Sequence, residues 1–136
     1  HATHTTLVEF SRGTEHGGYA EAYPHLSDAI LSKAAALYLR VSYAESLRKN
    51  RARFNPERPD SILEHGLTDA KLETLYREVD WDTWTADDPV YLHTNKHRVP
   101  YVVFENEDDV TTDRGDALGQ RLESTLNTLW TRYNQR

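Results

Sequence analysis

Apolar positions recur along the chain in patterns that predict strands at four places. The clearest run covers residues 99–104, where almost every side chain is apolar. A strand of this kind is typical of a parallel sheet that is covered on both faces. A second run of strand formers covers 36–42, and shorter runs at 5–10 and 90–92 predict two further strands.

Helical spacing separates these runs. Apolar residues recur at helical intervals over 19–35, and a charged helical run covers 45–53 and stops before Asn55-Pro56. Thr68 is a good cap for a helix that continues through Tyr76.

Residues 36–53 allow two interpretations. A single helix would place Leu39, Tyr43 and Leu47 on one face, whereas the strand formers at 36–42 favour a strand followed by a helix. We expect the strand and then the helix.

The last predicted helix is the longest. Asp113 is a good residue to cap it, and its apolar residues form one stripe: Leu118, Leu122, Leu126, Leu129 and Tyr133. Upstream of the last strand, residues 80–88 are predicted to form an acidic loop. This loop carries Trp81 and Trp84, which suits docking to a partner.

Without the short run at 90–92, the order of elements is strand, helix, strand, helix, helix, strand and helix. Strands separated by helices argue for βαβ units. The sequence therefore predicts an α/β fold with a parallel sheet and flanking helices. Its 136 residues form a single domain or the C-terminal portion of one.

Composition excludes several classes of function. The net charge of −6 disfavours nucleic acid and anionic membranes as partners. The absence of Cys excludes disulfides, thiolate catalysis and zinc held by Cys. No apolar run approaches the roughly 20 residues that a membrane span needs, and no signal peptide is visible, so we expect a cytoplasmic protein.

Three segments, taken in chain order, resemble the later part of a P-loop nucleotide kinase. Residues 7–13 (Leu-Val-Glu-Phe-Ser-Arg-Gly) resemble the strand with an acidic end that follows the phosphate loop. Residues 37–53 resemble the apolar strand that runs into an arginine-rich lid helix, and 99–106 resemble the last strand, which ends near the nucleotide base. The resemblance implies an incomplete P-loop kinase-like fold with residues 44–80 as a lid-like helical segment.

One departure from the family is the absence of its defining phosphate loop, GxxxxGK[ST]. The nearest candidate, residues 13–19, has no Lys and carries Glu15, which would repel phosphate. We therefore expect the loop upstream of His1 or on a partner chain. The chain has no Met, which agrees with removal of an earlier segment. The strand that bears the loop would lie centrally in the sheet.

The resemblance implies site residues for phosphoryl transfer with ATP and Mg²⁺ as cofactors. Glu9 ends a strand and would hold Mg²⁺ through water or accept a proton, while Arg12 would bind substrate. Arg48 and Arg51 would act as lid arginines that stabilise the transferring phosphoryl group, and Arg53 would contact substrate. The structural alternatives are a solvated edge carboxylate and a solvated basic helix face.

The base of the nucleotide would lie at the end of the last strand. Glu105 and Asn106 stand there and would contact adenine, with ordinary turn chemistry as the alternative. The implied function is an ATP-dependent small-molecule phosphotransferase, with a nucleotide and a small-molecule substrate as partners.

Two other interpretations stay open. A redox-inactive thioredoxin-like binding domain would have Pro100 as its cis proline, His16–Tyr19 in place of the redox cysteines, and a long insertion between Tyr43 and Val99. A structural accessory subunit of a larger assembly would need no ligand.

Overall fold

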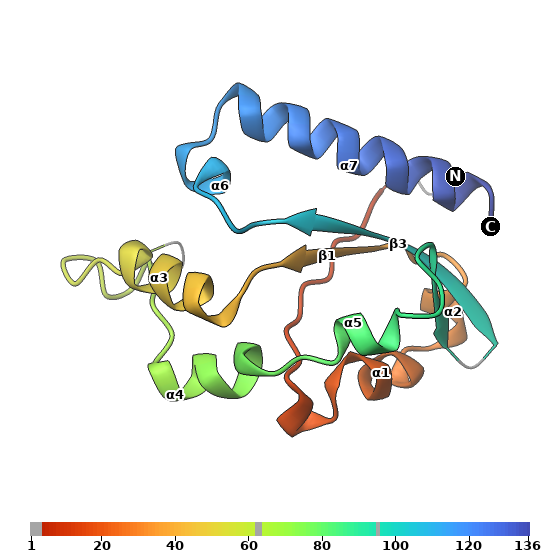
Figure 1. The fold of residues 1–136 in the computed structure, drawn as a ribbon, viewed down its shortest axis with the longest axis horizontal. Coiled ribbons are helices and arrows are strands. Elements are labelled where there is room, and N and C mark those ends of the chain that lie inside the picture. The colour runs from red at the N-terminus through yellow and green to blue at the C-terminus, as the bar shows by residue number, and fades with distance from the viewer. Residues whose placement is uncertain (1–3, 62–63, 95) are drawn as a thin grey trace.

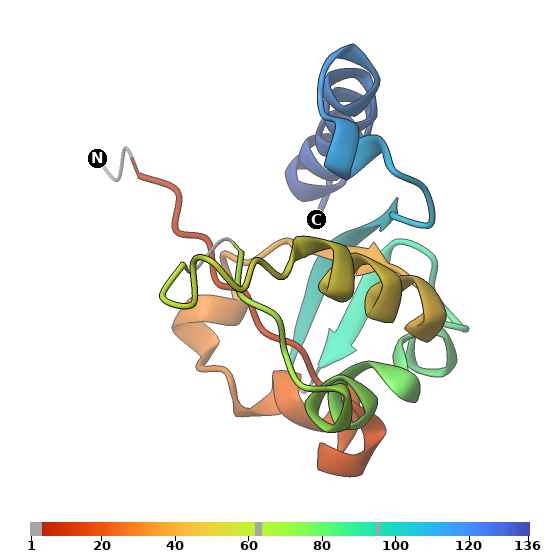
Figure 2. The same ribbon diagram turned by 90° about the vertical axis from the view of Figure 1, so that its left-hand side faces the viewer.

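The computed structural model describes residues 4–61, 64–94 and 96–136 of the chain. Within these residues a three-stranded sheet lies between two layers of helices (Figures 1 and 2). Helices α1 (Gly18–Ala22), α4 (Asp69–Leu72) and α5 (Trp81–Trp84) lie on one side, and α7 (Asp116–Asn134) lies on the other. The remaining helical elements are η1 (Thr14–His16), η2 (Tyr23–His25), α2 (Asp28–Leu31), α3 (Tyr43–Arg53), the π-helical turn η3 (Glu73–Arg77) and α6 (Val110–Asp113).

The sheet has the strand order β1-β3-β2. Strand β1 (Ala36–Arg40) runs parallel to β3 (His97–Glu105), and β2 (Tyr91–Thr94) runs antiparallel to β3. The α/β class is confirmed, and so is one parallel pair. The prediction of an all-parallel sheet is wrong for β2, because β2 ends only two residues before β3 begins and so short a connection joins antiparallel strands.

Residues 36–53 form a strand and then a helix, which confirms the interpretation that we expected. Residues 36–40 form β1, and α3 begins three residues later. Ser42 caps α3: its hydroxyl oxygen accepts from the backbone N–H of Glu45 at 3.2 Å. The backbone N–H and the hydroxyl of Ser42 both donate to the carboxylate of Glu107, beyond the end of β3. Ser42 therefore links the start of α3 to the segment that follows β3.

Pro100 lies in the central strand, where proline is normally excluded because it has no N–H. The backbone N–H of Tyr101 donates to Val90 on the β2 side, so position 100 faces the β1 side. Strand β1 begins opposite Tyr101, and no ladder bond is lost at Pro100. The peptide bond before Pro100 is trans, since no cis peptide occurs in the described part of the chain, so the cis proline of the thioredoxin-like alternative is not found.

The two faces of β3 pack against different layers. Tyr101 lies in the main core cluster, and its ring contacts Trp81 edge-on at 5.4 Å between centroids. Phe104, on the opposite face, lies under the guanidinium of Arg121 from α7. Side chains alternate between the faces of a strand, so both faces of β3 are covered. This explains the nearly continuous apolar run.

The expected loop at 80–88 with exposed tryptophans is wrong. Residues 81–84 form α5, and Trp81 is only 2% exposed. Its ring stacks on Tyr38 of β1 at 4.1 Å, and Trp84 packs edge-on against it. Asp82 remains at the surface, whereas the Asp80 carboxylate accepts from the backbone N–H groups of Tyr19 and Ala20. The acidic composition of this segment therefore did not reveal the buried indole.

The expected strand over residues 5–10 is also wrong. No strand forms there, and Leu7 and Val8 are 92% and 76% exposed. A strand needs a neighbouring chain to satisfy its backbone groups. Within the described residues, β1 pairs only with β3 and leaves its other edge open.

The expected helix over 19–35 is broken into α1, η2 and α2. Pro24 lies within the first turn of η2, and Leu26 has an extended backbone that ends the helical segment. Ser27 then precedes α2. Proline has no N–H to donate within an α-helix. The segment is therefore helical in short pieces, as its spacing indicates, but it does not form one continuous helix.

The last helix begins at Asp116, as expected, but Asp113 does not cap it. Asp113 ends α6, and Arg114 and Gly115 have φ angles of 62° and 81° that separate the two helices. Gly115 is the residue that precedes the first turn of α7. In the described part of the chain, no helix has the length and apolar character to cross a bilayer.

Candidate functional site

The carboxyl ends of β1 and β3 meet at one edge of the sheet, beside the start of α3 (Figure 1). Ligands of open α/β sheets bind outside this edge. Side chains from β1, α3, α5, the segment from the end of β3 through α6, and α7 converge there, and we call them the carboxyl-edge cluster. Its members are Arg40, Ser42, Glu45, Arg48, Lys49, Asp82, Glu105, Asn106, Glu107, Asp108, Asp109, Thr111 and Arg121.

Lys49 is the central cation of the cluster. Its Nζ donates to the backbone oxygens of Asn106 at 2.9 Å and Asp108 at 2.6 Å. It also donates to Asn106 Oδ1 at 2.8 Å and lies 3.4 Å from Thr111 Oγ1. The ammonium thus fastens the middle of α3 to the loop that follows β3.

Arg48 binds two carboxylates. Its Nε and Nη2 donate to Glu45 at 2.7 and 2.6 Å, and Nη2 also contacts Asp109. The hydrogen bond from Arg48 lowers the pKa of Glu45, and the bonds to Glu45 and Asp109 raise the pKa of Arg48. A phosphate that binds Arg48 must therefore compete with carboxylates.

Two further arginines close the cluster. Arg40 donates to Glu105 at 2.8 Å and to Asp82 at 2.6 Å. Arg121 forms a two-pronged pair with Asp108, at 2.9 and 2.6 Å, and donates to the backbone oxygen of Glu105. In this cluster the carboxylates outnumber the cations.

The structure brings three of the expected site residues into the cluster: Arg48, Glu105 and Asn106. Arg51 lies elsewhere on α3 and pairs with Asp69 at 2.9 Å, where both side chains are 62% exposed. Charge pairs this exposed contribute little to stability, so Arg51 is free to exchange partners.

The other expected site residues lie outside the cluster. Glu9 and Arg12 belong to the exposed segment before η1, and Arg53 ends α3 at the surface. Among the described residues, no hydrogen bond or ion pair joins these three side chains to the cluster. Their roles stay predictions.

The Asn106 amide has a fixed orientation within the cluster. The Oδ1 atom of Asn106 is occupied by Lys49 and Thr111, so the amide presents its N–H groups outward. Within the described residues, no group of three or more His, Asp or Glu side chains is placed to hold a metal ion. Mg²⁺ is often held by one or two carboxylates together with substrate phosphates, which is the role expected of Glu9.

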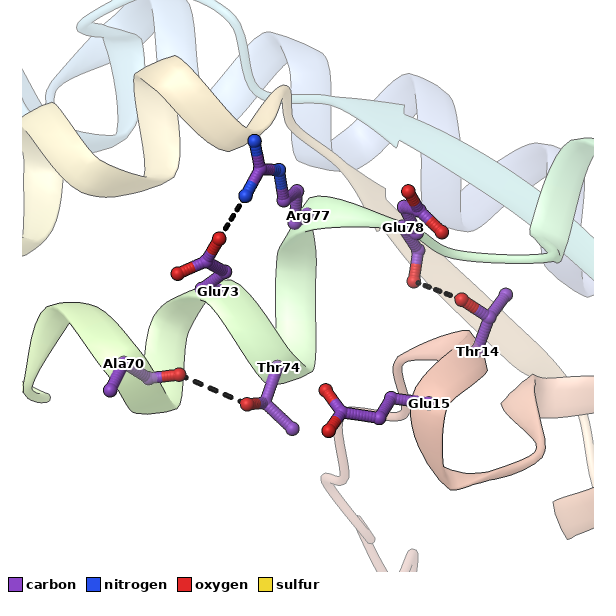
Figure 3. Close-up of a pocket in the computed structure, with 7 residues that line it drawn as sticks. All are labelled: Thr14, Glu15, Ala70, Glu73, Thr74, Arg77 and Glu78. Carbon is purple, nitrogen blue, oxygen red and sulfur yellow. Dashed lines mark hydrogen bonds and ion pairs between the residues drawn. The ribbon is translucent and has the colours of Figure 1, made fainter.

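One hollow of the surface lies away from this edge. It has a volume of about 630 Å³ and separates η1 from α4 and η3, with Thr14, Glu15, Glu73, Thr74 and Arg77 among its walls (Figure 3). Arg77 is already paired with Glu73 within the same wall. Its open, polar lining includes no expected site residue, so we place the candidate site at the carboxyl edge instead.

Sequence reasoning missed Lys49, Thr111 and Arg121 as organising residues. In the run from Glu105 to Asp109, backbone and side-chain oxygens bind these three side chains. The available signal was position: a polar run directly after the strongest strand lies at the ligand edge of a parallel pair.

A scan against protein-family models, a search of curated proteins and a search of solved structures each found no match.

Proposed function

We propose that this chain supplies the base-side and lid elements of an ATP-dependent small-molecule phosphotransferase. The observation that carries the proposal is that Arg48 from α3 and Asn106 from the end of β3 both belong to the cluster at the carboxyl edge of a parallel strand pair. One element offers a guanidinium for phosphate, and the other offers an amide for a base.

The residues have separate roles in this proposal. Asn106 and Glu105 contact the adenine ring, and Arg48 and Arg51 bind the phosphates and the charge that develops during transfer. Glu9 acts on Mg²⁺ or the attacking hydroxyl, and Arg12 and Arg53 contact the substrate. ATP supplies the phosphoryl group, and Mg²⁺ neutralises its oxygens.

ATP binding would rearrange the salt bridges of α3. Glu45 and Asp109 hold Arg48 in the structure, and a triphosphate offers it a stronger acceptor. Arg48 is half exposed, which leaves it room to turn outward.

The test is a titration of the ¹⁵N-labelled 136-residue chain with MgATP. We expect amide shifts at residues 48–49 and 105–106. The Arg48→Ala variant should bind about tenfold more weakly, the effect of losing one charge-assisted hydrogen bond. Arg58→Ala is the matched control, because Arg58 pairs with Glu64 at 3.1 Å outside the cluster.

The titration can also contradict the proposal. The proposal is contradicted if no amide shifts occur at millimolar MgATP, or if Arg48→Ala and Arg58→Ala weaken MgATP binding equally. Far-UV circular dichroism of both variants checks that α3 is retained.

A second candidate function is that of a non-catalytic accessory subunit. It is favoured by α7, where Leu126 and Trp130 are 48% and 64% exposed, as in a surface that a partner covers. Under this alternative, MgATP leaves the spectrum of the chain unchanged.

A further inference from the structure

Asn106 is held by contacts on its backbone and its side chain. Its backbone N–H donates to the carbonyl oxygen of Arg40 at 2.8 Å, and its own carbonyl oxygen accepts from Lys49 at 2.9 Å. Its side-chain Oδ1 accepts from Lys49 Nζ and from Thr111 Oγ1, both at 2.8 Å. The residue is half-buried, so both ends of it are fixed against the protein.

The chemistry of Lys49 determines which way the amide points. An ammonium group only donates hydrogen bonds, so the amide atom that faces it must be the oxygen. Thr111 Oγ1 lies 3.4 Å from the same ammonium and 2.8 Å from Asn106 Oδ1. The Thr111 hydroxyl therefore accepts from Lys49 and donates to Asn106. Turning the amide over would place its NH₂ group against the ammonium of Lys49, which cannot accept a hydrogen bond.

The nitrogen of this amide faces away from Lys49 and Thr111. Among residues 4–61, 64–94 and 96–136, no hydrogen bond is made by Asn106 Nδ2. The end of β3 thus presents an N–H donor whose direction is set by Lys49 on α3 and Thr111 on α6.

We propose that Lys49 and Thr111 are positioning residues that hold Asn106 so that its Nδ2 donates to an acceptor nitrogen on the base of the bound nucleotide. The inference rests on the proposed function and names its base selectivity. Adenine has an unprotonated N1, whereas hypoxanthine and guanine carry a hydrogen on N1. A fixed N–H donor can bond to N1 of adenine, whereas it faces the N1–H group of hypoxanthine or guanine and cannot bond to it.

The cost of a mismatch follows from the fixed amide. When the Asn106 N–H group faces the N1–H group of a base, neither has an acceptor, and an unsatisfied group of this kind weakens binding by about tenfold or more. An amide that is free to turn would present Oδ1 to the N1–H of hypoxanthine and would lose the preference. Selectivity between ATP and ITP, which share a triphosphate, therefore reports the orientation of Asn106.

The experiment compares Kd values for MgATP and MgITP in the wild-type chain and in Thr111→Val, Thr111→Ser and Lys49→Met variants. The side-chain NH₂ signal of Asn106 in ¹⁵N spectra is followed in parallel. We expect the wild type to prefer ATP by about tenfold. Lys49→Met removes the ammonium that fixes the amide oxygen, so it should reduce the preference to within about twofold. Thr111→Val removes only the second donor; it should shift the Asn106 signal and reduce the preference in part, and Thr111→Ser, which keeps the hydroxyl, should retain it.

The outcomes separate the inference from the proposed function. If the wild type binds ATP but Thr111→Val and any folded Lys49→Met both keep the full preference over ITP, the positioning role is overturned and the function stands. If the wild type binds neither nucleotide, the proposed function is overturned and the inference with it. Thr111→Val and Thr111→Ser keep the lysine contacts, so the test survives even if Lys49→Met does not fold.

Discussion

Asp108 shows how one carboxylate is controlled by one arginine at the carboxyl edge. Arg121 reaches it from α7 through two hydrogen bonds, at 2.9 and 2.6 Å. The bond from Arg121 is the main cause that lowers the pKa of Asp108 from 3.8 to about 2, and a backbone bond from Val110 adds to it. Asp108 therefore stays ionised in moderate acid and keeps α7 attached to the end of β3.

The sign of the pH dependence follows from this lowered pKa. The folded chain binds a proton at Asp108 less readily than the unfolded chain, so the ionised carboxylate stabilises the fold above pH 4. This contribution is lost as the pH falls from about 4 to about 2. A ¹³C titration of the Asp108 carboxyl group should give a midpoint near 2.

The Arg121→Gln variant tests the cause of that shift. The midpoint of Asp108 should return toward 3.8 when its partner loses the charge. Arg58→Gln, a change of the same kind outside the cluster, should leave the midpoint in place. A wild-type midpoint already near 3.8 would mean that Arg121 does not control Asp108 in solution.

At the scale of elements, α3 depends on its first turn. Its apolar face is poor, and of its residues only Asn50 is buried, where the amide bonds the backbone of Leu67 in both directions at 2.8 Å. Polar contacts therefore hold α3 to the sheet and to the following segment. Ser42 both caps α3 and links it to the segment after β3, because its hydroxyl accepts from the backbone N–H of Glu45 and donates to the carboxylate of Glu107.

Replacing Ser42 should destabilise the chain measurably. We expect Ser42→Ala to lower the free energy of unfolding by about 1 kcal/mol, the usual effect of a lost N-terminal cap. Urea unfolding followed by circular dichroism measures it. Ser42→Thr should keep most of the stability, and Ser46→Ala, inside the same helix, should change it by less than about 0.5 kcal/mol. Equal effects of Ser42→Ala and Ser46→Ala would show that the cap is unimportant.

At the scale of the molecule, the two sides of the sheet are covered unequally. The side that faces α5 contains Trp81, Tyr101 and a cluster of stacked rings. On the other side, no residue of α7 is buried, although its amphipathic stripe packs against β3. Leu39, on the open-edged strand β1, is 51% exposed as well. Exposed apolar residues beside an open strand edge favour association.

We expect the 136-residue chain to self-associate as its concentration rises. Sedimentation equilibrium should give a mean mass above 15.7 kDa at high concentration. Trp130→Glu should reduce the association, because Trp130 is 64% exposed on the uncovered flank of α7. Gln120→Glu adds the same charge elsewhere on the helix and serves as the control. A mass that stays at 15.7 kDa at every concentration would contradict the expectation.

The elements that could be predicted are those with a strong local pattern. The apolar run of β3 and the stripe of α7 were found within a few residues, because burial on both faces and a period of 3.6 residues leave a direct mark on the sequence. Residues 5–10 have the composition of a strand, but composition does not supply a neighbouring strand. Trp81 lies among acidic residues and is nevertheless buried.

The candidate site was predictable only in part. Asn106 could be placed at a strand end, and Arg48 on an adjacent helix, from order along the chain alone. The orientation of the Asn106 amide could not, because it depends on Lys49 and Thr111, which reach it from different helices.

The sequence by itself determined the elements that local pattern encodes: β1, β3, α3, α7 and the α/β class that their order implies. Only the tertiary structure decided which charges neutralise one another, which tryptophan is buried, and which atom of Asn106 faces outward. The physical reason is the separation along the chain over which each effect acts. Backbone preference and periodic burial act over a few neighbouring residues, whereas Lys49 and Asn106, like Arg40 and Glu105, meet only when β1 and β3 pair.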